Sequence, residues 1–225
     1  SNVAHSAKMC AIHSSSAIGV NVFQYWIGKN VSNISYALGL CAKNNNSAKE
    51  IHFERKFKIN SNFQFSPNID VVIINEDTSK IKAYGIECKF SEAYSQRNHS
   101  GLNEKYITEI KEQWKGIPNL FKLAKKISPD DNRFHYLHSA QLLKHILGLK
   151  KKYGIGGFRL LYLWYDVPGE EGCIHSKEIE KFSKIANRDK IKFHSIRYQE
   201  LISKLGKELY DDHKEYVDYL SNRYL

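Results

Sequence analysis

Apolar side chains recur along this chain with two different spacings. From Ala17 to Val31 they lie roughly three to four positions apart, which makes an apolar stripe along one side of a helix. From residue 51 onward, short apolar runs rich in Ile are separated by polar turns, which is the pattern of β-strands. The change of spacing predicts a helical start followed by a sheet.

The same two spacings predict the remaining elements. The expected helices are residues 17–31, 32–42, 102–115, 131–149, 177–188, 198–209 and 212–223, and the expected strands are 51–59, 69–75, 81–90, 158–165 and 191–196. Helices on both sides of a strand-rich segment predict an α/β layered fold with a mixed sheet. The strand at 69–75 is apolar on both faces, which is typical of a central strand covered on two sides.

The chain is expected to form a single domain over residues 1–225. It has no repeat and no low-complexity tract, and its prolines, Pro67, Pro118, Pro129 and Pro168, do not make a linker. A hydrophobic content of 42% and an aromatic content of 12% exclude a disordered chain.

No membrane partner is expected, and the predicted location is cytoplasmic. The longest apolar run, near residues 158–165, has the length of a strand, whereas a bilayer span needs about 20 residues. The four cysteines are scattered without a Cys-x-x-Cys pair, which indicates reduced thiols.

The net charge of +10 suggests a polyanionic partner. No acid lies between Asp131 and Asp166, and the segment between them is rich in Lys, Arg and His. The residues expected to contact nucleic acid are Lys144, Lys150, Lys151 and Lys152. A basic surface without any partner is the competing interpretation.

An aspartate in an apolar strand is the strongest chemical signal. Asp70 lies between Ile69 and Val71, where an ionised carboxylate costs free energy unless it is paired or binds a metal. In the next strand, alternation puts Glu87 and Lys89 on one face and turns Cys88 towards the core. Two carboxylates can hold Mg²⁺, and a nearby lysine can orient water or stabilise phosphate charge. The competing interpretation is an exposed Glu87–Lys89 ion pair, worth about 0–1 kcal/mol.

Pro67-Asn68-Ile69-Asp70 followed by Glu87-Cys88-Lys89 resembles the motif of the PD-(D/E)xK nuclease superfamily. The sequence departs from that pattern in having Pro-Asn-Ile, rather than proline alone, before the aspartate. The resemblance implies a restriction-endonuclease-like, three-layer core at about residues 14–165, with a central mixed sheet flanked by helices. Residues 166–225 would then be a C-terminal extension of helices and a strand.

The resemblance also implies roles for individual residues. Asp70, Glu87 and the backbone carbonyl of Cys88 would bind Mg²⁺ or Mn²⁺, and Lys89 would act on the attacking water or the transition state. Members of the superfamily often carry a further acid ahead of the core strands. Glu54 is expected to be this acid and to act as a further metal ligand, and Glu50 is the alternative.

Some branches of the superfamily carry Gln-x-x-x-Tyr on the helix after the Glu-x-Lys strand. Here Gln141 is followed four residues later by His145, so histidine stands in the tyrosine position. His138, Gln141 and His145 share one helical face. Gln141 is expected to belong to the catalytic site and to contact the DNA backbone.

The expected function is a metal-dependent DNA endonuclease. The first alternative is an inactive nucleic-acid-binding module of the same fold, and the second is a protein-interaction domain whose charge is incidental. Restriction-like enzymes often act as dimers, because one site cuts one strand. A homodimer is therefore one expectation, although the sequence predicts no dimer surface.

Overall fold

A five-stranded mixed sheet forms the centre of the protein, whose computed structural model describes residues 15–94 and 100–225. The strands lie side by side in the order of the chain. β1, β2 and β3 are antiparallel neighbours, whereas β3, β4 and β5 run parallel. The strands are β1 (Ala48–Lys56), β2 (Asn68–Asn75), β3 (Ala83–Lys89), β4 (Phe158–Trp164) and β5 (Phe193–Arg197).

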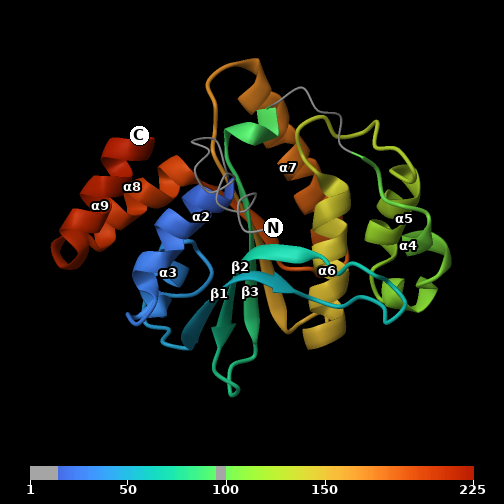
Figure 1. Cartoon of the computed structure of the whole chain (residues 1–225), viewed down its shortest axis with the longest axis horizontal. Coiled ribbons are helices and arrows are strands. Elements are labelled where there is room, and N and C mark those ends of the chain that lie inside the picture. Colours follow the sequence, from blue (N-terminus) through green and yellow to red (C-terminus); the bar gives the residue numbers. More distant parts are fainter. Residues whose placement is uncertain (1–14, 95–99) are drawn as a thin grey trace.

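Helices cover both faces of this sheet. Figure 1 shows one layer on each side, with α4 to α7 on one face and α2, α3, α8 and α9 on the other. This arrangement confirms the predicted α/β fold with a mixed sheet flanked by helices. The α-helices are α2 (Ser15–Phe23), α3 (Val31–Ala37), α4 (Lys105–Thr108), α5 (Pro118–Lys126), α6 (Ser139–Tyr153), α7 (Glu170–Arg188), α8 (Tyr198–Glu208) and α9 (Tyr210–Tyr224). Single 3₁₀ turns are η1 (Gln24–Trp26), η2 (Ser91–Tyr94) and η3 (Lys111–Trp114).

Two apolar cores lie on the two faces of the sheet. Val72 of β2 packs into the core under α4 to α7, whereas Val71 and Ile73 pack into the core under α2, α3, α8 and α9. Burial on both faces is what the apolar run at 69–75 predicts. It makes β2 a fixed central element from which Asp70 projects.

Several predicted helix limits are wrong. The first helix ends at Phe23, and 102–115 contains only the short elements α4 and η3. The helix expected from residue 131 begins at Ser139, because the Asp131 carboxylate accepts hydrogen bonds from the backbone N–H groups of Arg133 and Phe134 and from the Ser139 hydroxyl. These bonds stabilise a loop before the helix.

Two further corrections concern α7 and β1. Helix α7 begins at Glu170 rather than at residue 177, directly after Gly169, whose φ is 104°. The acids in its first turn are favoured there by the helix dipole. The first strand is Ala48–Lys56, three residues ahead of the expected 51–59.

The C-terminal segment continues the same architecture. β5 pairs with β4, and α8 packs against both β5 and α9. Residue 14, where the restriction-like core was expected to begin, lies outside the described residues, as does Cys10. Cys41, Cys88 and Cys173 are free thiols. No helix in the described part of the chain is long and apolar enough to cross a membrane.

Candidate active site

The side chains of Glu87 and Lys89 project from β3 on the face of the sheet that α6 covers. Their neighbours Ile86 and Cys88 pack into the opposite core, as the alternation of strand side chains predicts. The Glu87 side chain is only 1% exposed, and that of Lys89 is 17% exposed. The alternative of an exposed surface ion pair is therefore wrong, because the pair is enclosed between the sheet and α6.

Two partners hold the Glu87 carboxylate. Lys89 Nζ lies 2.9 Å from Oε1, and His145 Nε2 of α6 lies 2.8 Å from Oε2. Burial alone would raise the pKa of Glu87, but Lys89 and His145 more than offset it and lower the pKa to about 2. Glu87 is therefore a buried, ionised carboxylate at neutral pH.

Asp70 lies next to the Glu87–Lys89 pair, at the point where the pairing of β2 with β3 ends. The register of the two strands stops at Val71 opposite Ile86, and the next contact is a hydrogen bond from the Cys88 backbone N–H to Asp70 Oδ2, at 2.8 Å. Burial and the negative charge of Glu87 raise the pKa of Asp70 well above its usual range, although Lys89 and the Cys88 hydrogen bond oppose the rise. The two carboxylates therefore sit close enough to repel each other.

Glu54 lies beside Asp70 on the neighbouring strand. Its flanking residues Phe53 and Arg55 pair with Val71 and Ile69, and its own backbone is left-handed, with a φ of 52°. The Glu54 carboxylate accepts a hydrogen bond from the Asn68 side chain, and its charge contributes to the raised pKa of Asp70.

Glu50, the rival for the upstream acid, lies further along the same strand. It pairs with Ile74, four positions from Asp70, and its carboxylate contacts the exposed His52 ring at 2.9 Å. The structure brings Glu54, and not Glu50, next to Asp70.

The carboxylates of Asp70 and Glu87 fit a hard divalent cation. Mg²⁺ typically takes one or two carboxylates and keeps several waters. Asp70 uses only Oδ2 in its hydrogen bond to the described residues, and a cation would relieve the repulsion that raises its pKa. Both oxygens of Glu87 already face Lys89 or His145, so Glu87 would share one of them with the metal. No group of three or more His, Cys, Asp or Glu side chains within residues 15–94 and 100–225 forms a ready metal cage.

The predicted residues of α6 lie at different distances from these carboxylates. The Lys144 ammonium group lies close enough to Glu87 for the carboxylate to favour its charged form. Burial has the larger effect and lowers the pKa of Lys144 overall. Half-buried Gln141 lies about one turn towards the start of the helix. Lys150 donates a hydrogen bond to the Gln113 carbonyl at 3.0 Å, so its ammonium group holds η3 against the helix.

Sequence reasoning placed His145 on the right helix face but gave it no role. The available signal was a histidine among the apolar positions of the helix that follows the Glu-x-Lys strand. No pattern in the sequence points to the second group of side chains beside Glu87, which consists of Tyr162, His175 and Tyr94. Tyr162 of β4, in register with Glu87, hydrogen-bonds the buried His175 ring at 3.0 Å, and the other ring nitrogen contacts the Tyr94 hydroxyl at 3.0 Å. This chain of side chains forms the wall next to Glu87.

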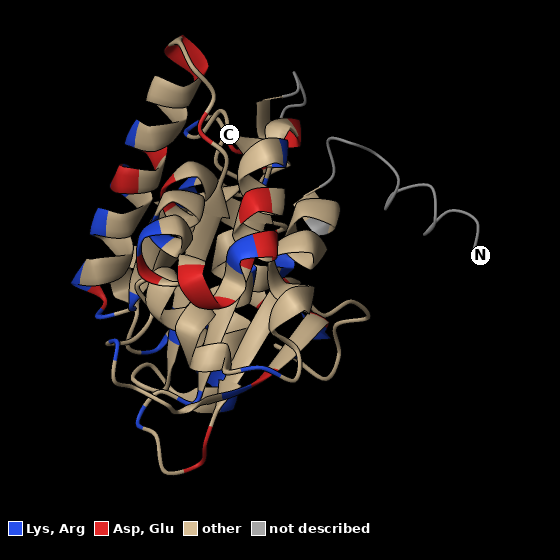
Figure 2. Cartoon of the chain, turned by 90° about the vertical axis from the view of Figure 1, so that its left-hand side faces the viewer, with Lys and Arg blue, Asp and Glu red and all other residues tan. Residues whose placement is uncertain are grey.

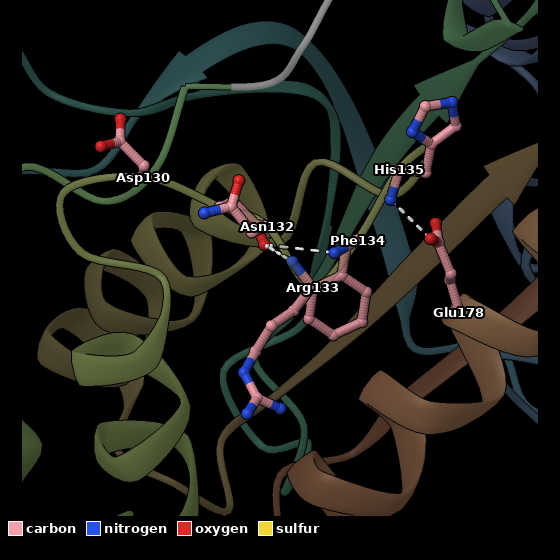
Figure 3. A pocket seen from close by; sticks show the side chains of 7 residues that line it. Asp130, Asn132, Arg133, Phe134, His135 and Glu178 are labelled. Atoms are coloured by element: carbon pink, nitrogen blue, oxygen red, sulfur yellow. Dashed lines mark hydrogen bonds between the residues drawn. The ribbon is translucent and has the colours of Figure 1, made fainter.

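A polar cavity of about 490 Å³ lies elsewhere, between the loop at residues 130–135 and α7. Figure 3 shows Glu178 reaching from α7 towards the backbone of His135. The same carboxylate also accepts hydrogen bonds from the N–H groups of Tyr136 and Leu137, both at 2.9 Å. Its acceptors are thus used to hold the loop, and none of the predicted site residues lines this cavity.

A family model matches the chain along almost its whole length. The model of the family described as Restriction Endonuclease associating with ARP (REase-ARP) matches residues 3–225. No curated protein matches the chain, and neither does any solved structure. The family match covers almost the whole chain, including every element that builds the site around Asp70 and Glu87. The protein therefore belongs to the REase-ARP family and is restriction-endonuclease-like.

Proposed function

We propose that this protein is a Mg²⁺- or Mn²⁺-dependent DNA endonuclease of the PD-(D/E)xK type. The observation that carries the proposal is that Asp70 lies next to the buried Glu87–Lys89 pair, at the point where the pairing of β2 with β3 ends. A restriction-endonuclease-like family supports nuclease chemistry and DNA as the substrate. Because one site cuts one strand, cleavage of both strands would need a second copy or a second binding event.

Asp70 and Glu87 would hold the metal, with Glu54 and the Cys88 carbonyl as further oxygen donors. When bound, such a cation acidifies a water molecule and stabilises negative charge on a phosphate. His145 is a positioning residue in this arrangement. Its hydrogen bond fixes the Glu87 carboxylate from the side opposite Lys89.

Lys89 would act as a cation and a hydrogen-bond donor. Burial disfavours its charged form, but Glu87 and Asp70 outweigh that effect and raise the pKa of Lys89 above its ordinary value. The ammonium group therefore keeps its protons at neutral pH and cannot serve as a general base there. Its proposed role is to orient the attacking water and to stabilise charge on the phosphate.

Plasmid cleavage tests the proposal. Wild-type protein should nick or linearise supercoiled DNA with Mg²⁺ or Mn²⁺ and not with EDTA. Lys89→Gln should slow cleavage about 10²–10³-fold, the usual cost of losing one donor to developing charge. Lys207→Gln, which removes an exposed lysine of α8, is the matched control and should cut at the wild-type rate. Equal cleavage by Lys89→Gln and the control would contradict the proposal.

The binding module without turnover stays a second candidate, because both Glu87 oxygens already have partners. If Glu87 shares neither oxygen with a cation when DNA is bound, the metal lacks its second carboxylate. The protein would then retard DNA on a native gel and yield no products with either metal.

A further inference from the structure

A strongly basic groove lies next to the candidate active site. It has a volume of about 350 Å³ and is lined by seven residues, of which five are cationic and none is acidic. The lining residues are Arg55, Lys56, Phe57, Lys58, Gly148, Lys151 and Lys152. Arg55, Lys56 and Lys58 come from the end of β1 and the residues after it, whereas the other lysines come from α6.

Close packing brings these two walls together. The chain after β1 crosses α6 at Gly148, where a Cβ atom would lie 2.7 Å from Phe57 Cβ. Lys151 and Lys152 follow Gly148 by three and four positions and so lie on the same side of the helix. Lys151 Nζ also donates a hydrogen bond to the Ile59 carbonyl, at 2.9 Å, which ties the second wall to the first.

The charges of the groove are not balanced by acids. Lys56, Lys58, Lys151 and Lys152 are exposed, and within the described parts of the chain none of the five cations forms an ion pair. The helices on the side shown in Figure 2 differ from the groove in their charge, because acidic and basic positions are interspersed along them. Cations on that side include ones paired with acids, such as Lys214 with Asp218 at 2.6 Å. Five unpaired cations held together repel one another, and a polyanion relieves that repulsion.

The groove begins at the edge of the candidate active site. Arg55 follows Glu54 directly and pairs with Ile69, the neighbour of Asp70. The rise along a strand is about 3.3 Å per residue, so Arg55 and Glu54 are that far apart along the backbone of β1.

We propose that this groove binds the phosphate backbone of the DNA strand that enters the active site. The inference rests on the proposed function for the nature of the substrate, and it assigns Arg55, Lys56 and Lys58 to binding, alongside Lys151 and Lys152. The contacts read phosphate and carry no base specificity.

Salt-dependent binding tests the groove separately from catalysis. The affinity for a short fluorescein-labelled DNA duplex is measured by anisotropy in EDTA over a series of KCl concentrations. The test variant is Lys58→Gln/Lys152→Gln, with one exposed lysine from each wall. The control is Lys177→Gln/Lys207→Gln, two exposed lysines of α7 and α8 outside the groove. Both variants have the same net charge, and thermal melting checks that both are folded.

The groove variant should flatten the dependence of log affinity on log salt by about 1.8, at roughly 0.9 for each lost phosphate contact. The control should keep the wild-type slope. Equal slopes for the two variants, or wild-type binding without salt dependence, would overturn the inference. A wild type that binds through the groove but never cleaves would reject the nuclease and leave the groove standing. Cleavage by a wild type whose two variants bind alike would reject the groove alone.

Discussion

The two central carboxylates have pKa values displaced in opposite directions, although they lie on adjacent strands. Glu87 has two partners that favour its charge, whereas Asp70 is buried close to other negative charges. The sequence predicts both residues, because an acid in an apolar strand and Glu-x-Lys in the next are visible as patterns. The lowered pKa of Glu87 depends on His145 as well as on Lys89, and His145 lies 58 positions from Glu87 in the chain.

Asp70→Asn is expected to make the protein more stable at neutral pH. The pKa of Asp70 is higher in the folded state than its ordinary value of 3.8, so ionisation above that value costs folding free energy. The advantage of the variant over wild type should be absent below the ordinary pKa and grow as pH rises towards the folded pKa. Urea unfolding of both proteins across this range measures it, and a variant less stable than wild type at neutral pH would contradict the placement of Asp70.

Glu87→Gln is expected to have the opposite effect. The pKa of Glu87 falls from 4.5 to about 2 on folding, which corresponds to a contribution on the order of 3 kcal/mol. That contribution is present above the ordinary pKa and is lost as pH falls towards 2. Unfolding free energies should therefore show the largest deficit at neutral pH and a smaller one in acid, while a pH-independent deficit would argue against the ionised pair.

Helices and strands that are determined by the local pattern of apolar residues are predicted better than those that depend on residues distant in the sequence. The strands that carry Asp70 and Glu87 follow directly from their apolar runs. Helix α5 is not among the predicted helices, and residue 117, its N-cap, makes no side-chain cap. The Asp189 carboxylate at the end of α7 instead accepts the N–H groups of Asn119 and Leu120, at 3.1 and 2.7 Å. A cap that comes from 70 residues away cannot be seen in the local sequence, although Pro118 at the first helical position is a local signal for the helix start.

The crossing of α6 by the chain after β1 makes a separate prediction about packing. Gly148→Ala should lower the free energy of unfolding by about 1–3 kcal/mol, because the new methyl group would overlap Phe57. Gly206→Ala in α8 is the matched control, since the nearest atom, on Val217, is 3.7 Å from the added Cβ. The control should be unchanged or slightly stabilised by the better helix propensity of alanine. Equal stability of the two variants by urea unfolding would contradict the close crossing.

Across the whole molecule, charge is distributed unevenly. Residues 198–225, which form α8 and α9, contain six acids and four Lys or Arg, a net charge of −2 that leaves +12 for the rest of the chain. The sequence predicts the excess of positive charge and its concentration near α6. It does not predict the groove, because Arg55 and Lys58 join Lys151 and Lys152 only through the crossing at Gly148.

Plasmid cleavage by Asp70→Asn, compared with wild type in Mg²⁺, tests the proposed active site most directly. The substitution keeps the size of the side chain and removes the charge that would hold the metal. The variant should melt at a higher temperature than wild type and still bind DNA in EDTA, yet yield no metal-dependent products. A variant that cleaves at the wild-type rate would show that Asp70 does not belong to the catalytic machinery.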